Sequence, residues 1–321
     1  MTDPRRAAGL HVYALPLRTR FRGIEVREGV LVRGDAGWGE FSPFREYDDA
    51  EATAWWRAAV EAADLGWPPP VRYRIPVNAT VPAVAPDAVA GVLDRFPGCL
   101  TAKVKVAEPG QSPREDEARI EAVRSFLGEF GRIRVDANGA WDVDRAARLL
   151  PAYDRAAGGL EYVEQPCGTV EELAALRRKL LVPIAADESV RRADDPLRVA
   201  RLEAADVVVL KVQPLGGVRA ALRIAETIGL PVVVSSALET SVGIAAGVAL
   251  AAALPELPYA CGLATAGLLA RDVVAEPFVA KGGVLTVRPV APDPALLADA
   301  GADETTDAWW RDRVRRVAGR L

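Results

Sequence analysis

The sequence is poor in the residues that form zinc sites and disulfide frameworks. It contains three cysteines and a single histidine, His11, among 321 residues. Cys99, Cys167 and Cys261 lie far apart and form no CxxC pair, which argues against both a disulfide framework and a zinc site. We therefore interpret the cysteines as small buried apolar residues.

Two further absences restrict where the protein acts and what it binds. The longest apolar run, residues 242–254, is shorter than the roughly 18 residues of a membrane-spanning helix. The start, MTDPRRAAGL, has two arginines but no apolar stretch after them, so we expect no secretory signal and a cytoplasmic protein. With 40 basic and 44 acidic residues the net charge is -4, and no basic block typical of nucleic-acid binding is present. The expected partner is a small molecule, and nothing in the sequence indicates an oligomeric state.

The sequence does contain a regular alternation of strands and helices from Leu100 onward. The β-branched runs are LTAKVKV, RIRVDAN, LEYVEQP, VPIAADES, DVVVLKVQP and PVVVSSALE. Helices are expected between them at about 113–129, 142–157, 169–180, 194–203, 216–228 and 240–253. Six such units in a row predict an α/β fold whose parallel sheet closes into a barrel with helices outside. The last strands are expected near Tyr259 and at 283–287.

The N-terminal part has a different pattern. The runs VYALPLRTR, GVLVRG and AGWGEFSPF predict an antiparallel meander, followed by a helix at 48–64 and a proline-rich connector, WPPPVRYRIP. The helical tail TTDAWWRDRVRRVAGRL is expected to pack back onto this part. The predicted organisation is an α+β domain of residues 1–97, completed by the tail 289–321, and a barrel of residues 98–288.

Lys103 and Lys105 stand out in the first run of the barrel, LTAKVKVAE. Because side chains alternate along a strand, both lysines lie on one face and Ala102, Val104 and Val106 on the other. Taken alone, the run fits an exposed edge strand that carries lysines against aggregation. The charges at the other strand ends favour a different interpretation.

A charged residue ends or follows each of the next four runs, namely Asp136, Glu164, Asp187 and Lys211. Function in a parallel barrel sits at the C-terminal ends of the strands, so these side chains and the two lysines are predicted to meet at one mouth. Three carboxylates there would repel one another unless one is protonated or a cation lies among them. Oxygen ligands without imidazole or thiolate favour magnesium over zinc or copper, with Asp136, Glu164 and Asp187 as the ligands.

The lysine pair indicates the chemistry. Two positive charges roughly 7 Å apart repel by about 2 kcal/mol at an effective dielectric of about 20. This repulsion and a nearby metal ion both lower the pKa of a lysine, so that one lysine can act as a general base near neutral pH. Lys211, on the opposite side, can act as an acid or a fixed cation. With a metal ion to take up negative charge, the predicted reaction is proton abstraction next to a carboxylate, through an enediolate.

Five motifs resemble, in order and spacing, those of the enolase superfamily and in particular its muconate lactonizing enzyme subgroup. They are AKVKV, VDANGAW, YVEQP, AADES and LKVQPLGG. The resemblance covers almost the whole chain and implies a modified TIM barrel under an α+β capping domain. The implied roles are magnesium ligand for Asp136, Glu164 and Asp187, base for Lys105, stabiliser of the enediolate oxygen for Lys103, and the lysine on the far side of the substrate for Lys211. Asn138 shares a face with Asp136 and is either a polar contact of the site or a turn residue.

Fewer features set the substrate within the superfamily. The lone His11 excludes the subgroup that uses a histidine base on the barrel, and CGLATAGLL lacks the DxD pair usual in dipeptide epimerases. The short chain, VSSALETSVGIAAG and GLATAGLL resemble the o-succinylbenzoate synthase family of menaquinone synthesis. This resemblance implies syn-dehydration of 2-succinyl-6-hydroxy-2,4-cyclohexadiene-1-carboxylate, with Lys105 removing the proton and assisting departure of the hydroxyl. Lys211 would stabilise the intermediate by a cation–π contact.

The remaining substrate contacts are expected from two places. Backbone N–H groups near Ser235, Ser236 and Gly262 are candidates to hold the succinyl carboxylate, with a helix N-cap as the alternative role of each serine. The cap segments RTRFRG and AGWGEFSPFREYD are expected to form a lid, with the alternative that their aromatic side chains are simply the core of the cap.

Three alternative functions remain at this point. An N-succinylamino acid racemase would use Lys105 and Lys211 as opposed bases on the same six charged residues. Muconate cycloisomerisation is a weaker alternative. A barrel retained only for binding would be expected to have lost at least one of the charged positions, and none is lost.

Overall fold

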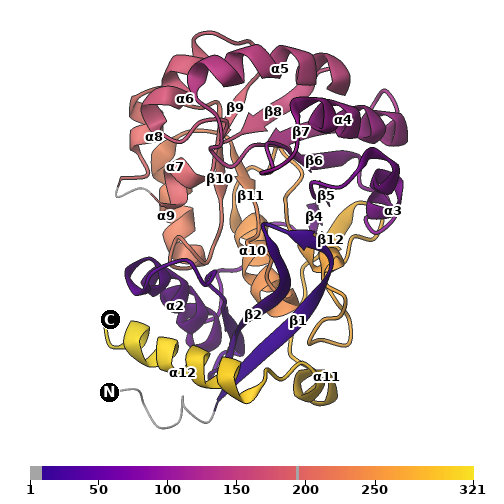
Figure 1. Ribbon diagram of the computed structural model, residues 1–321. Coiled ribbons are helices and arrows are strands. Elements are labelled where there is room, and N and C mark those ends of the chain that lie inside the picture. Colours follow the sequence, from indigo (N-terminus) through magenta and orange to yellow (C-terminus); the bar gives the residue numbers. More distant parts are fainter. Residues whose placement is uncertain (1–8, 193–194) are drawn as a thin grey trace.

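The structure, a computed structural model, describes residues 9–192 and 195–321 and consists of a cap and a barrel (Figure 1). The cap sheet contains consecutive antiparallel strands, β1 (Leu10–Phe21), β2 (Ile24–Arg33) and β3 (Trp38–Phe41). Helix α2 (Asp49–Asp64) packs on this sheet and begins after Asp48, whose carboxylate accepts the N–H of Glu51. The predicted meander and its helix are confirmed.

The C-terminal tail lies on the cap. Helix α12 (Glu304–Ala318) runs beside α2 and the cap strands (Figure 1). Its buried residues Trp310, Val314 and Val317 join Trp55 and Trp56 in one apolar cluster. Helix α12 therefore shares one apolar core with α2 and the cap strands.

The barrel is built on a parallel sheet. In the described residues this sheet has seven strands, in the order β11-β10-β9-β8-β7-β6-β5. The strands are β5 (Ala79–Val81), β6 (Thr101–Lys105), β7 (Arg132–Asp136), β8 (Leu160–Glu164), β9 (Ile184–Ala186), β10 (Val207–Leu210) and β11 (Val232–Val234). The parallel sheet that was predicted from the alternation of β-branched runs with helices is confirmed.

Helices follow the barrel strands and cover the outside of the sheet (Figure 1). They are α3 (Val89–Leu93), α4 (Pro113–Leu127), α5 (Val143–Ala157), α6 (Val170–Arg177), α7 (Glu188–Arg191), α8 (Arg198–Arg201), α9 (Val218–Ile228) and α10 (Ser241–Ala253). Short 3-10 helices lie at η1 (Pro86–Ala88) and η2 (Thr265–Leu268), and α11 (Pro294–Asp299) precedes α12. The helix expected at 194–203 is reduced to α8, and residues 193–194 lie outside the described part of the chain.

The two edges of the barrel differ from the expectation. Strand β5 belongs to the parallel sheet although it lies within the range 1–97 that the sequence pattern assigned to the capping domain. It is only three residues long, too short for periodicity to reveal. The run expected as a last barrel strand at 283–287 is instead β12 (Val284–Thr286), which pairs antiparallel with β4 (Arg74–Pro76).

A short segment after Tyr259 closes the barrel. Ser235 forms a parallel bridge with Gly262, and Val77 forms one with Cys261. The N–H of Gly262 donates to the carbonyl of Val234 at 2.8 Å. Residues 261–262 therefore join β11 to the chain just before β5 and complete the ring.

Helix α10 lies between the barrel and the cap. Its sequence, SVGIAAGVALAAA, is small and apolar on every side, and nearly all of its residues are buried. It contacts both β11 of the barrel and β3 of the cap. In residues 9–192 and 195–321 no helix is both long and apolar enough to cross a membrane.

We expect Gly39→Ala to destabilise the fold strongly. A Cβ atom on Gly39 in β3 would lie 2.0 Å from the carbonyl oxygen of Ala59 in α2. Because the obstacle is backbone, strand and helix must separate, and the free energy of unfolding should fall by about 3 kcal/mol. Urea unfolding measures this loss. The control Gly91→Ala lies in helix α3 with open space around its Cβ and should be neutral or slightly stabilising; equal losses in both variants would contradict the close approach.

Candidate active site

The charged residues predicted to meet at the barrel mouth stand side by side at neighbouring strand ends. Lys105 of β6 pairs in register with Asp136 of β7, and Asp136 pairs with Glu164 of β8. Strand β6 lies between β5 and β7, so the interpretation of Lys103 and Lys105 as residues of an exposed edge strand is wrong. All these side chains are largely or fully buried.

Ion pairs link the lysines to the carboxylates. The Nζ atom of Lys103 donates to both carboxylate oxygens of Glu164, at 2.7 and 2.8 Å, and lies 3.2 Å from Asp136. Lys105 donates to Asp136 at 2.5 Å and to the side-chain oxygen of Asn138 at 2.7 Å. Asn138 thus contacts the proposed base directly, and with a φ of +47° it is also a turn residue.

The third carboxylate lies on the other side of the site. Asp187, directly after β9, accepts from Lys211 at 2.6 Å and from Arg191 at 2.9 Å. Arg191 also donates to Glu188 at 2.6 Å, and Glu188 accepts from the amide of Asn138 at 3.2 Å. A chain of contacts therefore connects both halves of the site, and it includes Arg191 and Glu188, which sequence reasoning did not place there.

The two neighbouring lysines have opposite pKa shifts. Burial, together with the charge of Lys103, lowers the pKa of Lys105, although Asp136 opposes this. Burial also disfavours the charged form of Lys103, but Glu164 and Asp136 outweigh it and raise the pKa of Lys103 well above its ordinary value. The lysine that is easier to deprotonate is therefore Lys105.

The carboxylates differ as well. Burial and the nearby charge of Asp136 raise the pKa of Glu164 to about 7. Burial acts in the same direction on Asp136, but Lys105 and Lys103 overcome it and lower the pKa of Asp136 far below its usual range. The pKa of Asp187 is likewise lowered because Arg191 and Lys211 outweigh its burial.

The donor set suits a hard divalent ion. Asp136, Glu164 and Asp187 offer only carboxylate oxygens, and they are fully buried at the ends of three consecutive strands. Among the described residues no three acidic, histidine or cysteine side chains form a ready coordinating group. Each of these carboxylates is instead held by an ammonium or guanidinium group.

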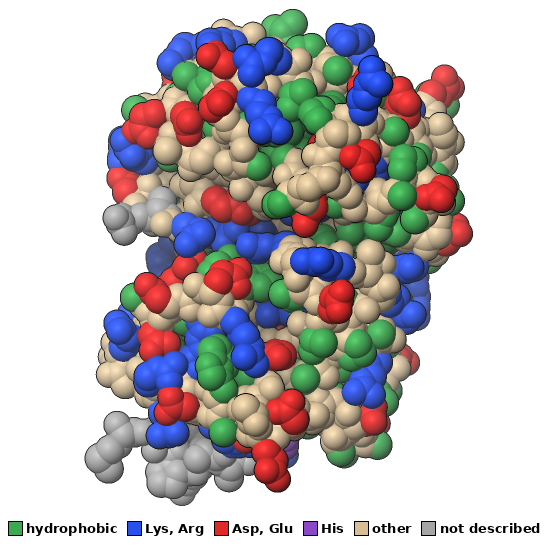
Figure 2. Space-filling model, viewed as in Figure 1, with side chains coloured by type: hydrophobic (Ala, Val, Ile, Leu, Met, Phe, Trp, Pro, Cys, Tyr) green, Lys and Arg blue, Asp and Glu red, His purple; other side chains and the backbone are tan. Residues whose placement is uncertain are grey.

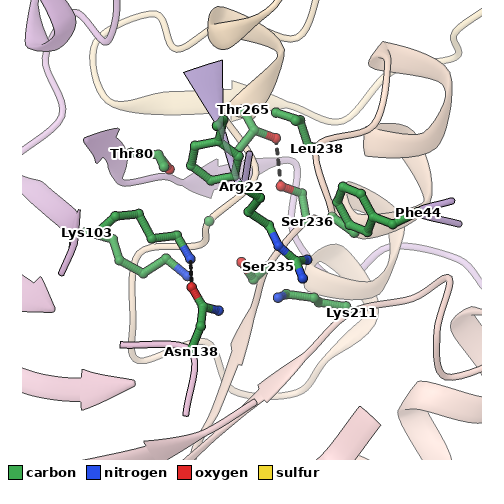
Figure 3. Close-up of a pocket in the computed structure, with 14 residues that line it drawn as sticks. Arg22, Phe44, Thr80, Lys103, Asn138, Lys211, Ser235, Ser236, Leu238 and Thr265 are labelled. Carbon is green, nitrogen blue, oxygen red and sulfur yellow. Dashed lines mark hydrogen bonds between the residues drawn. The ribbon is translucent and has the colours of Figure 1, made fainter. Parts of the chain in front are cut away.

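A cavity lies above these charges, where the cap meets the barrel. Figure 3 shows Lys103 and Asn138 on one side of it and Lys211 on the other, with Ser235 between them. The cap contributes Phe21, Arg22 and Phe44 to the lining. Basic side chains also gather in the hollow band between the two domains (Figure 2).

Part of the expected lid therefore reaches the cavity. Phe21 and Arg22 come from RTRFRG, at the tight turn between β1 and β2, and Phe44 from the glycine-rich segment. Phe41, in contrast, is a fully buried core residue of the cap, and the ring of Trp38 packs against that of His11 at an interplanar angle of 50°. The sequence indicated which segment reaches the cavity but not which of its side chains line it. The lining depends on how the cap packs on the barrel.

The role expected for the backbone N–H groups of Ser235, Ser236 and Gly262 is wrong. All three residues line the cavity. Their N–H groups, however, donate to the carbonyls of Leu210, Gly262 and Val234 in the seam that closes the barrel. These N–H groups are therefore already bonded within the protein, and the hydroxyl of Ser236 is bonded to that of Thr265 at 2.6 Å.

The stability of the protein is expected to depend on pH through the buried Glu239, which follows Leu238 of the cavity lining in the sequence. Burial and the charge of Glu40 raise the pKa of Glu239 to about 7. Between pH 4.5 and 7 the folded protein then holds a proton that the unfolded chain has lost, so stability falls as pH rises through this window. The shift corresponds to at most about 3 kcal/mol. Urea unfolding of wild type and Glu239→Gln should show the variant gaining relative stability from pH 4.5 to 8; a pH-independent difference would contradict the shift.

Comparison with known proteins places this geometry in a family. A model of enolase C-terminal domain-like sequences matches residues 90–293, and one of enolase N-terminal domain-like sequences matches residues 12–63. Solved structures with the same fold include muconate lactonizing enzyme from Pseudomonas fluorescens complexed with muconolactone, at a TM-score of 0.78 and 23% identity over 91% of this chain and 98% of that one. Another is the N-succinyl Arg/Lys racemase from Bacillus cereus, at a TM-score of 0.76 and 19% identity over 92% and 97%.

Curated relatives are much more similar in sequence. The o-succinylbenzoate synthase of Thermobifida fusca is 65% identical over 94% of this chain and 93% of its own length. That of Mycolicibacterium smegmatis is 59% identical over 95% and 94%, and that of Mycobacterium marinum 57% over 95% and 92%. The chain therefore belongs to the enolase superfamily and, within it, to the family of the o-succinylbenzoate synthases.

Proposed function

We propose that this chain is a hydro-lyase that dehydrates 2-succinyl-6-hydroxy-2,4-cyclohexadiene-1-carboxylate to o-succinylbenzoate in menaquinone biosynthesis. The single observation that carries the proposal is the 65% identity, over nearly the full length of both chains, to a curated o-succinylbenzoate synthase. The site supports it independently, because a lysine with a lowered pKa and a set of buried carboxylates suit proton abstraction next to a carboxylate.

Lys105 is the base in this proposal. It removes the proton from the ring carbon that carries the carboxylate, and the electron pair moves into an enediolate. The same ammonium group then gives a proton to the hydroxyl leaving from the same face, so one C–H and one C–O bond break, a C=C bond forms and water departs. Asn138, bonded to Lys105 at 2.7 Å, orients its Nζ atom.

Asp136, Glu164 and Asp187 are the residues that would hold Mg²⁺. Enolase superfamily enzymes generally depend on a divalent metal, and an all-carboxylate donor set favours magnesium. When bound, the ion supplies positive charge that stabilises the developing negative charge on the substrate carboxylate. Lys103 would donate toward the same oxygen atoms, while Lys211 stands on the opposite side as a fixed cation.

The charge of the site fits a substrate with two carboxylates. Four cationic side chains, Lys103, Lys105, Lys211 and Arg191, are bonded to four anionic ones, Asp136, Glu164, Asp187 and Glu188. A divalent ion and the guanidinium group of Arg22 would add positive charge to this set, and the neutral Lys105 that acts as the base would remove one, so the site keeps an excess of positive charge that a dianion offsets. Arg22 and the side chains of Ser235 and Ser236 remain to receive the succinyl arm.

A direct assay tests the proposal. The purified protein with Mg²⁺ should convert the cyclohexadiene substrate to an aromatic product, followed by absorbance. Racemisation of N-succinylamino acids, measured in parallel by polarimetry, should be much slower. Rapid racemisation without formation of the aromatic product would overturn the proposal in favour of the racemase, and the lack of both activities would leave a binding barrel.

A further inference from the structure

One wall of the cavity is the segment that connects β11 to α10, residues 235–240, which we name the wall loop. Ser235, Ser236, Ala237 and Leu238 all line the cavity. Leu238 has a φ of +66°, a left-handed conformation that costs a leucine about 1–2 kcal/mol. Such a conformation persists only where surrounding contacts hold it in place.

The first of these contacts comes from Arg27 in β2 of the cap. This arginine is 2% exposed, and its guanidinium lies over the ring of Phe44, 4.6 Å from the centroid. Its Nε atom donates to the carbonyl of Leu238 at 2.9 Å, and Nη2 donates to that of Ala237 at 3.3 Å. The same Nη2 also donates to the carbonyl of Ser42 in the cap. One buried side chain thus ties the strained part of the wall loop to the cap.

The second contact comes from Glu40 in β3. Its Oε2 atom accepts from the hydroxyl of Thr240 at 2.5 Å, from the N–H of Thr240 at 3.1 Å and from the N–H of Gly243 at 3.0 Å. A carboxylate at the start of α10 is favoured by the helix dipole. Tyr13 and Ser42 of the cap each donate to Oε1 at 2.7 Å and fix the carboxylate from behind. The far end of the wall loop is therefore also held by the cap.

We propose that Arg27 and Glu40 are positioning residues through which the cap sets the shape of the substrate cavity. Neither residue lines the cavity, and each acts on the wall loop through buried, charge-assisted hydrogen bonds. The proposal rests on the proposed function only in taking this cavity as the substrate site. It assigns part of the enzyme's substrate affinity to cap residues that never touch the substrate.

The test compares Arg27→Lys and Glu40→Gln with two matched controls. Arg124→Lys alters a half-buried arginine that also binds backbone carbonyls, those of Ala157 and Gly131, outside the cavity. Asp272→Asn alters a buried carboxylate that accepts from the N–H and hydroxyl of Ser241, at the start of the same helix but outside the wall loop. The readouts are KM, kcat, and amide hydrogen exchange of residues 236–243.

Both test variants should raise KM about tenfold with little change in kcat, because Lys105 and Lys211 are not attached to the wall loop. Amide exchange of residues 236–243 should become at least about tenfold faster. The controls should lose stability without a change in KM. Unchanged KM in the test variants, with or without faster exchange, overturns the positioning role. If the wild-type protein does not dehydrate the substrate, the proposed function is wrong. In that case only the amide exchange data test whether Arg27 and Glu40 hold the wall loop. Should Glu40→Gln fail to fold, Arg27→Lys carries the test.

Discussion

Lys105→Met is expected to lower kcat for dehydration by about 10² to 10⁴-fold, the range typical of a lost general base. Methionine keeps the length and apolar stem of lysine but cannot accept a proton. Exchange of the substrate's ring proton with deuterated water, which needs only the first step, should disappear to the same extent. Both rates are measured with the purified variant under saturating substrate and Mg²⁺.

The matched control for this variant is Lys179→Met. Lys179 also forms an ion pair, 3.2 Å from Asp144, but its side chain is 51% exposed and lies outside the cavity. We expect its kcat to stay within about twofold of wild type, because exposed ion pairs contribute little. If Lys105→Met retained more than a tenth of the wild-type kcat, another group would have to be the base.

Removal of divalent metal is expected to reduce dehydration by at least about 100-fold and to leave the fold intact. The loss follows from the missing stabilisation of negative charge on the substrate. The fold should persist because Asp136, Glu164 and Asp187 are already paired with cationic side chains of the protein. Activity is measured after chelation and again after return of Mg²⁺, and folding is followed by circular dichroism.

A direct measurement of Mg²⁺ binding tests the metal site independently of catalysis. Calorimetric titration should show one Mg²⁺ per chain, and Glu164→Gln should weaken its affinity by about 10 to 100-fold. The control Glu188→Gln alters a carboxylate that contacts Arg191 and Asn138 and should change the Mg²⁺ affinity less. Full activity in a preparation shown to be free of metal would refute the metal's role.

The strand-end charges could be predicted because they follow from local rules. Parallel strands bring their C-terminal ends to one edge, so Asp136, Glu164 and Lys211 needed only the strand pattern to be placed together. The opposite pKa shifts of Lys103 and Lys105 could not be assigned in advance. They depend on which carboxylate at the ends of the nearby strands each ammonium group reaches.

The parts that escaped prediction depend on contacts between distant segments. Arg191 bonds to Tyr47 of the cap as well as to Asp187, and nothing in its own surroundings marks it. The N–H groups of Ser235 and Gly262 were expected to be available to a ligand, because the strand expected near Tyr259 did not show that residues 261–262 pair with Ser235 and Val77. Arg27 and Glu40 resemble ordinary residues of a surface sheet until the cap is docked onto α10.

The pairing that closes the barrel, at residues 261–262, lies late in the sequence and therefore affects folding during synthesis of the polypeptide. It bridges β11 and the chain at Val77, so the barrel stays an open sheet until most of the polypeptide has left the ribosome. Until then β5 and β11 present unpaired backbone groups, which are sites for aggregation. Contacts of such long sequence separation also slow folding. Chains released early, before residue 262, should therefore depend on chaperones for solubility far more than the full-length protein does.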